Sequence, residues 1–220
     1  MESQTGNLFV KAASFAAERH RDQRRKNALA SPYINHPLSV AARLDQAGVV
    51  DEVVLVAAVL HDTVEDTKTT LKEIEELFGE AVASVVAEVT DDKSMPKHLR
   101  KIMQIEHAKT KSTRAKLVKL ADKLDNLSDL FTGPPPMGWS AERVQGYFTW
   151  AYMVVEGLRG TNASLEAHLD ILFQGNVTVD GVTLCCVPSN PLDREEVLNR
   201  FLANMEEVGK EEKPCLTVLC

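Results

Sequence analysis

The sequence predicts an all-α domain, a bundle of short and closely linked helices, followed by a C-terminal extension of different character. Two observations predict the helices: apolar residues recur at three- and four-residue spacing along most of the chain, and capping residues, glycines and prolines interrupt them at short intervals. The 220 residues, 44% of them hydrophobic and 26% charged, suffice for one core. We therefore expect one domain over residues 1–175 and an extension over residues 176–220.

In the first part of the chain, each apolar run has a recognisable boundary. Pro37 suits the first turn of a helix, Asp51 is a candidate N-cap, and Thr70 and Glu73 have the spacing of a capping box. The runs predict helices at about residues 8–16, 37–47, 53–60, 71–78 and 81–89.

The later part of the chain has one firm break, at Gly133-Pro134-Pro135-Pro136. Around it, the apolar runs predict helices at about residues 96–109, 114–127, 140–158 and 162–173. After Gln174, Asp180-Gly181 between two short β-type runs predicts a two-residue hairpin, and residues 192–208 predict an amphipathic helix. Because an isolated hairpin is only marginally stable in water, we expect the extension either to dock on the domain or to be partly disordered, and we favour a loosely held extension.

A histidine and an aspartate, His61 and Asp62, stand side by side at the end of the apolar run over residues 53–60. Two ionisable side chains at this place are costly to bury unless something binds them. Glu65 follows His61 by four residues and Asp66 follows Asp62 by four, so a continuing helix would bring the side chains toward one point. The pattern indicates a site.

Three further polar residues extend this set: His36, Asp122 and Asn126, the last two again four residues apart. Taken singly, each has an ordinary structural role, for example His36 as a turn residue before Pro37; taken together, they favour a metal site. Two imidazoles and two carboxylates suit manganese, iron or zinc better than magnesium or calcium. A metal with open positions can activate water, so the residues predict metal-dependent hydrolysis of a phosphoester.

The charge distribution points to a small phosphorylated ligand. A net charge of −7 argues against a nucleic-acid-binding protein, yet basic clusters occur at about residues 19–26, 93–101 and 109–119. Each cluster alone is typical of a solvated helix face. In an acidic chain with a metal-type site, the three together favour a phosphorylated nucleotide as the partner.

Several features fit a cytoplasmic protein without a membrane partner. The chain has no apolar run of the ~18 residues that a membrane span needs, and its first residues lack the basic start and apolar stretch of a signal peptide. All 4 cysteines come late, at Cys185, Cys186, Cys215 and Cys220. They form no disulfide framework for the fold, and a reducing compartment fits. The oligomeric state stays open.

The spacing of His36, His61-Asp62 and Asp122 resembles the metal-ligand pattern of the HD-domain phosphohydrolases, which implies an HD-domain helical bundle. More narrowly, residues 61–66 (HDTVED) and 118–123 (VKLADK) are similar to the hydrolase domain of RelA/SpoT proteins, and in particular to its stand-alone animal branch, the metazoan SpoT homologues. The resemblance covers about residues 7–174.

This resemblance implies a manganese-dependent enzyme that removes the 3′-pyrophosphate of guanosine tetraphosphate (ppGpp), giving GDP and pyrophosphate. For the animal branch it also implies removal of the 2′-phosphate of NADPH. The implied Mn²⁺ ligands are His36, His61, Asp62 and Asp122. The implied catalytic residues, which activate water or orient the substrate, are Glu65, Asp66 and Asn126. The implied contacts to base, ribose or phosphates are Arg25, Lys26, Lys97, Arg143 and Tyr147.

Two positions depart from the pattern of the animal branch: Gly146 stands where a glutamate is usual, and Ser128 stands where a basic residue is common. A glycine inside a helix costs about 1 kcal/mol relative to alanine, so we expect the helix to be weaker at Gly146. The extension after Gln174 has no counterpart in the resemblance.

Other functions stay open. A nucleoside monophosphate phosphatase could use the same scaffold, although the basic clusters suit several phosphates better than one. A non-catalytic regulatory module could bind a nucleotide, although it has no use for the pair Glu65-Asp66. A two-metal centre would need further ligands, and His98 and His107, which lie among lysines, are poor candidates. A purely structural helical domain does not account for the ionisable groups at the ends of apolar helices.

Overall fold

The computed structural model describes residues 7–27 and 29–211, and most of these are helical. The helices are α1 (Leu8–Arg19), α2 (Asn35–Gln46), α3 (Glu52–Leu60), α4 (Thr63–Asp66), α5 (Leu71–Phe78), α6 (Glu80–Val89), α7 (Lys97–Ala108), α8 (Thr113–Thr132), α9 (Ala141–Glu156), α10 (Ala163–Phe173) and α11 (Pro191–Glu211). The strands β1 (Asn176–Val179) and β2 (Val182–Cys185) pair antiparallel. The predicted all-α bundle with a C-terminal hairpin and helix is confirmed.

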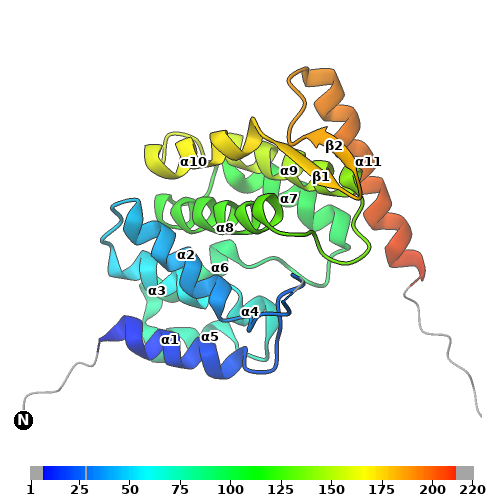
Figure 1. The fold of residues 1–220 in the computed structure, drawn as a ribbon. Helices are drawn as coiled ribbons and strands as arrows, with labels where there is room; N and C mark the ends of the chain where they lie inside the picture. The colour runs from blue at the N-terminus through cyan, green and yellow to red at the C-terminus, as the bar shows by residue number, and fades with distance from the viewer. Residues whose placement is uncertain (1–6, 28, 212–220) are drawn as a thin grey trace, which may run out of the picture.

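Helix α8 crosses the middle of the molecule (Figure 1). It contacts α2, α3 and α6 on one side and α9 and α10 on the other. Its buried residues include the charged side chains Lys119, Asp122, Lys123 and Asp125. Buried charges need partners, because an unpaired buried charge is strongly destabilising. Helix α8 therefore places a group of charged side chains in the core, where a functional site is expected. Within the described chain, no helix combines the length and apolar character needed to cross a membrane.

The second half of helix α3 is apolar on every side because it is enclosed by the bundle: every residue from Val56 to Leu60 is inaccessible to solvent, while Glu52 at the start of the helix is exposed. The helix does not continue through His61-Asp62. It ends at Leu60, and the short α4 begins at Thr63, whose hydroxyl donates to the Leu60 carbonyl at 2.7 Å. The condition of a continuing helix is therefore not met, and His61 and Asp62 lie in the turn between two helices.

The C-terminal extension packs against the bundle. Helix α11 contacts α7 and α9, and the hairpin contacts α9. Phe201 and Cys186 are buried, with 4% and 0% of their surface exposed. The expectation of a loosely held extension is therefore wrong for its described part. The predicted end with Cys215 and Cys220 lies outside the described residues, and the domain boundary at residue 175 stays a prediction.

Gly146 explains how closely α11 approaches α9. A Cβ atom built at Gly146 would lie 2.6 Å from Cβ and 2.8 Å from Cγ of Phe201, which is closer than packed carbon atoms come. The absence of a side chain at Gly146, the position that departs from the family pattern, therefore lets Phe201 of α11 pack directly against the backbone of α9. Its helix cost of about 1 kcal/mol is set against the burial of a phenylalanine side chain, which contributes roughly 1.5–3 kcal/mol.

Candidate metal centre and adjoining cavities

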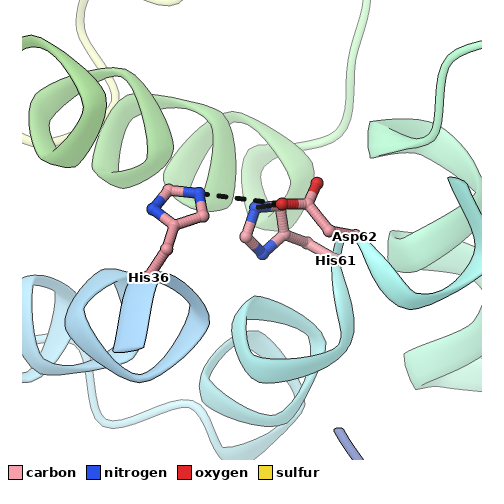
Figure 2. A group of neighbouring side chains, drawn as sticks. All are labelled: His36, His61 and Asp62. Atoms are coloured by element: carbon pink, nitrogen blue, oxygen red, sulfur yellow. Dashed lines mark ion pairs between the residues drawn. The ribbon is translucent and has the colours of Figure 1, made fainter. Parts of the chain in front are cut away.

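The two histidines and Asp62 come together at one point. His36 is the second residue of α2. His61 and Asp62 lie in the turn after α3. Figure 2 shows both imidazole rings facing the Asp62 carboxylate. The Asp62 Oδ2 atom lies 3.1 Å from His61 Nε2 and 3.7 Å from His36 Nε2. One ligand atom of each residue lies within 4.8 Å of the others, as metal ligands do.

Asp122 closes the same cluster from α8. Its Oδ1 atom lies 3.3 Å from His36 Nε2 and 3.8 Å from His61 Nε2. The predicted metal ligands, which stand far apart in the sequence, are thus neighbours in space. Two imidazole nitrogens and two carboxylates form a mixed nitrogen and oxygen set that a divalent transition metal accepts.

Hydrogen bonds orient both imidazoles toward the cluster. His61 Nδ1 lies 2.7 Å from the Ala58 carbonyl oxygen, and His36 Nδ1 lies 2.7 Å from Asp125 Oδ2. When Nδ1 donates its proton outward, Nε2 is left as the ligand atom. Among the described residues His61 Nε2 is buried without a hydrogen-bond partner. The residues present therefore fit a metal ion.

The electrostatics of the cluster also call for a cation. Burial alone would lower the pKa of His36, but its hydrogen bonds with Asp122 and Asp125 raise this pKa to about 9. The imidazole thus holds a proton between carboxylates when no metal neutralises them. A bound divalent ion would replace that proton, because histidine must be neutral to bind a metal.

The predicted catalytic side chains surround this cluster. Glu65 accepts hydrogen bonds from the Asp91 backbone N–H at 3.2 Å and from Arg100 Nη1 at 3.3 Å. Burial raises the pKa of Glu65, and the charge of Asp91 raises it further. A carboxylate with a raised pKa takes up a proton more readily, which suits a general base.

Asp66 and Asn126 lie on either side of the cluster. Asp66 pairs with Lys93 and accepts a hydrogen bond from the Tyr33 hydroxyl at 3.4 Å. Asn126 Nδ2 donates to Asp122 Oδ1 at 2.6 Å. The structure therefore brings all three predicted catalytic residues to the metal ligands, Asn126 by a direct hydrogen bond.

Two cavities adjoin here. The smaller, of about 240 Å³, is lined by the metal cluster and by basic residues of α7 and α8. The larger, of about 380 Å³, is lined by Arg25, Lys26 and Trp139 among others. The two cavities are adjacent, because four residues line both: Tyr33, Asp66, Asn126 and Tyr147.

The predicted substrate contacts are divided between these cavities. Arg25 and Lys26 line the larger cavity, Lys97 lines the smaller, and Tyr147 lines both. Arg143 lines neither; its guanidinium lies 4.7 Å from the centroid of the Trp139 ring, and Trp139 lines the larger cavity. Arg25 is held in place by Asn126 Oδ1 at 3.1 Å and Asp129 Oδ2 at 2.7 Å.

Sequence reasoning missed two supporting residues. The Tyr33 hydroxyl donates to Asp62 Oδ2 at 2.6 Å, and Asp125 holds His36 from behind. For Asp125 a signal exists, because it stands three residues after Asp122 and so lies on an adjoining part of α8. Tyr33 belongs to residues 32–37 (PYINHP), which are part of the family resemblance, but a tyrosine in a loop beside a proline gives no signal of this particular contact.

Comparisons with known proteins agree with this geometry. A family model for the HD domain matches residues 12–143. The guanosine-3′,5′-bis(diphosphate) 3′-pyrophosphohydrolase MESH1 of Xenopus tropicalis is 59% identical over 167 residues, which are 76% of this chain and 93% of that protein. The MESH1 protein of Homo sapiens is 57% identical over 175 residues, 79% of this chain and 97% of that protein.

A solved structure is also similar, that of a metazoan orthologue of SpoT that hydrolyses ppGpp and plays a role in starvation responses. It superposes with a TM-score of 0.74 at 50% sequence identity and covers 78% of this chain and 96% of that chain. The relatives are thus matched along nearly their whole length, while part of this chain lies outside each match.

Proposed function

This chain belongs to the HD-domain family, as a hydrolase related to the metazoan SpoT homologues, and from that premise we propose that it hydrolyses the 3′-pyrophosphate of ppGpp in a manganese-dependent reaction. The observation that carries the proposal is the adjacency of the two cavities. A cavity with basic and aromatic walls adjoins the cavity of the metal cluster and shares Tyr33, Asp66, Asn126 and Tyr147 with it. A nucleoside in the larger cavity would present its ribose phosphate to that cluster.

The metal ligands would be His36, His61, Asp62 and Asp122. When bound, Mn²⁺ supplies an electrophile that offsets the charge of the attacked phosphate and makes water more acidic. Manganese is the choice that the family resemblance favours among the metals that suit this ligand set.

The side chains around the cluster would carry the remaining steps. A water oxygen attacks the phosphorus esterified to the ribose 3′-oxygen; the new P–O bond forms as the bond from phosphorus to the 3′-oxygen breaks. Glu65 takes the proton of the attacking water, Asp66 orients that water, and the 3′-oxygen leaves with a proton as the ribose hydroxyl. The products are GDP and pyrophosphate, so no further reactant is needed.

The larger cavity would hold the nucleoside. Arg25 is fixed by Asn126 and Asp129 with its side chain only 13% exposed, which suits contact with a base or ribose. Trp139 and Tyr147 supply aromatic surface, with ring centroids 5.8 Å apart. The resemblance to the animal branch also implies removal of the 2′-phosphate of NADPH, and we propose this as a second activity.

Phosphorus NMR tests this proposal. The metal-stripped protein is given Mn²⁺ and then ppGpp, NADPH or GMP in separate tubes. Pyrophosphate from ppGpp supports the main proposal, and orthophosphate from NADPH supports the second activity. Turnover of GMP alone would favour a monophosphate phosphatase. Nucleotide binding without any turnover would favour the regulatory module and overturn the proposal.

The role of Glu65 has its own test. Glu65→Gln should keep Mn²⁺ binding and lose about 10²–10⁴-fold in kcat, the range that general base catalysis contributes. Glu106→Gln, at an exposed position of α7, is the matched control and should be unchanged. Unchanged turnover of Glu65→Gln would exclude Glu65 as the base.

A further inference from the structure

Helix α8 supplies lining residues to both cavities in a fixed order. Lys119, Asp122 and Lys123 line the smaller cavity, Asn126 lines both, and Asp129 lines the larger. An α-helix rises about 1.5 Å per residue, so the order along α8 is also the order in space. The metal ligand Asp122 has the nucleoside cavity on its C-terminal side and Lys119, one turn away, on its N-terminal side.

Two lysines, Lys101 and Lys119, line the smaller cavity. Lys119 is buried, with 7% of its surface exposed, and lines the smaller cavity together with Lys101 of α7. Over the ranges that the structure describes, neither amine makes a hydrogen bond or an ion pair. The contacts of Lys101 Nζ are aromatic, at 3.4 Å from the centroid of the Trp150 ring and 5.4 Å from that of Tyr147.

The acidic side chains nearby each have a closer partner than the two lysines, although the partner of Asp91 is a neutral amide. Asp91 accepts from Gln104 Nε2 at 2.6 Å. Glu65 pairs with Arg100, and Asp122 pairs with Lys123 at 3.0 Å. The positive charge of Lys101 and Lys119 is therefore not balanced by a direct partner among the described residues. Burial lowers the pKa of both amines, and the charge of Lys123 lowers it further, which reflects the cost of this arrangement. An anionic ligand would offset that cost.

Lys101 is also held rigidly. Trp150 is fully buried, and its indole N–H donates to the Lys101 carbonyl oxygen at 3.0 Å. The same ring lies under the Lys101 amine, a cation–π contact that stabilises a cation at one position. An amine fixed in advance loses little freedom when it binds an anion. The site is thus built before any ligand arrives.

We propose that Lys101 and Lys119 form a subsite for the phosphate that lies beyond the attacked phosphorus, which is the terminal phosphate of a 3′-diphosphate. This inference rests on the proposed function. It assigns the terminal phosphate to the smaller cavity and the nucleoside to the larger one. The terminal phosphate keeps its bridging oxygen throughout: only the bond between the inner phosphorus and the ribose 3′-oxygen breaks. The two lysines therefore bind the same group in substrate and in product pyrophosphate.

A pair of substrates that differ only in the terminal phosphate tests the subsite. These are guanosine 5′-diphosphate 3′-diphosphate and guanosine 5′-diphosphate 3′-monophosphate. Lys101→Met and Lys119→Met should each lower kcat/KM for the 3′-diphosphate by about 10- to 100-fold, the effect of one charge-assisted hydrogen bond. Hydrolysis of the 3′-monophosphate should change little. Equal losses with both substrates, or no loss with either, would overturn the proposal.

Two further variants complete the design. Lys116→Met, on α8 one turn before Lys119 and outside both cavity linings, is the matched control and should behave as wild type. Lys119→Arg keeps the charge and should recover part of the preference for the 3′-diphosphate. Mn²⁺ binding and the melting temperature are measured for each variant, so that a misfolded variant is recognised; the other lysine then carries the test.

A binding experiment separates this inference from the proposed function. Manganese-loaded protein is titrated with inorganic pyrophosphate and with orthophosphate in a calorimeter. Wild type should prefer pyrophosphate, and the lysine variants should lose that preference. If wild type hydrolyses neither nucleotide but the preference depends on the lysines, the proposed function fails and the subsite stands. If ppGpp is hydrolysed but the preference does not depend on the lysines, the subsite is overturned and the function stands.

Discussion

His36 and Asp125 are joined by a 2.7 Å hydrogen bond between Nδ1 and Oδ2, on the side of the imidazole that faces away from the metal cluster. Asp125 is itself fixed, because its Oδ1 accepts from Ser39 Oγ at 2.6 Å and from Arg43 Nε at 2.9 Å. A carboxylate behind a metal-binding histidine sets the ring orientation and leaves the other nitrogen free for the metal. Asp125 is therefore a positioning residue of this site.

Replacing this carboxylate should weaken metal binding without removing a ligand. Asp125→Asn is expected to lower Mn²⁺ affinity by about 10–100-fold, the usual cost of losing such an outer partner. Electron paramagnetic resonance of free Mn²⁺ during a titration measures the change. Asp45→Asn, exposed on the same α2 that carries His36, is the control. Equal affinity of wild type and Asp125→Asn would show that Asp125 has no part in orienting His36.

The same carboxylate predicts a pH dependence of the metal-free protein. Burial alone would raise the pKa of Asp125, but hydrogen bonds from His36, Ser39 and Arg43 lower it to about 2. Because an unfolded aspartate has a pKa of about 4, the ionised carboxylate stabilises the fold above pH ~4. That contribution, about 2 kcal/mol, is lost as the pH falls from about 4 toward 2.

Thermal unfolding of metal-free wild type and Asp125→Asn across this pH range measures the effect. The free-energy difference between the two proteins should be largest near neutral pH and should shrink as the pH falls. A difference that stays constant down to pH 2 would mean that the Asp125 charge contributes nothing to stability.

Metal addition should stabilise the fold through the cluster. A ligand at a hundredfold excess over its Kd adds about 2.7 kcal/mol to the free energy of unfolding, so Mn²⁺ should raise the melting temperature. Asp122→Asn should remove most of this shift, because Asp122 faces both histidines. Ca²⁺ should act more weakly than Mn²⁺, since imidazole nitrogens suit a transition metal better. A Ca²⁺ shift as large as the Mn²⁺ shift would contradict the ligand assignment.

Gly146→Ala should lower the free energy of unfolding, whereas the same substitution in an exposed helix usually raises it. In an exposed helix, alanine in place of glycine gains about 1 kcal/mol. Here the new Cβ would meet Phe201 at 2.6 Å, and overpacking of this kind costs about 1–3 kcal/mol. Urea unfolding should therefore show a loss of stability. Leu192→Ala, at a position of α11 that is 74% exposed, should have little effect. A stabilised Gly146→Ala would mean that α11 is not seated on Gly146.

The sequence predicts most of the helices because their signals are local. The Asp51 cap, the Thr70 cap and the apolar run up to Leu60 all lie within a few residues of the ends that they determine. The end of the apolar helix at Leu60 was predicted, but whether a helix continues through His61-Asp62 was left open. The Thr63 hydroxyl donates to the Leu60 carbonyl oxygen in the turn that the structure shows there.

Two kinds of signal predict site residues: an ionisable residue at a position where such residues are rare, and a match to the family pattern. His61-Asp62 stands at the end of a buried run, where ionisable side chains are rare unless they bind something, and Asp122 follows from the family pattern. Tyr33 and Asp125 contact the site from distant parts of the chain, which spacing does not reveal. The packing of the extension was missed for the same reason. From the sequence, Gly146 only weakens its helix, and its contact with Phe201 of α11 is visible only in the structure.

The contact between Gly146 and Phe201 links two features of the sequence, the glycine in α9 and the helix α11, in evolution. Without α11, a glycine at this place leaves a helix that is easier to fray and gains nothing. Without the glycine, a tail helix with a phenylalanine finds no room on α9. Each change alone is a disadvantage, so the two should be inherited together: homologues with such a tail should carry glycine here, and homologues that end before it should carry a residue with a side chain.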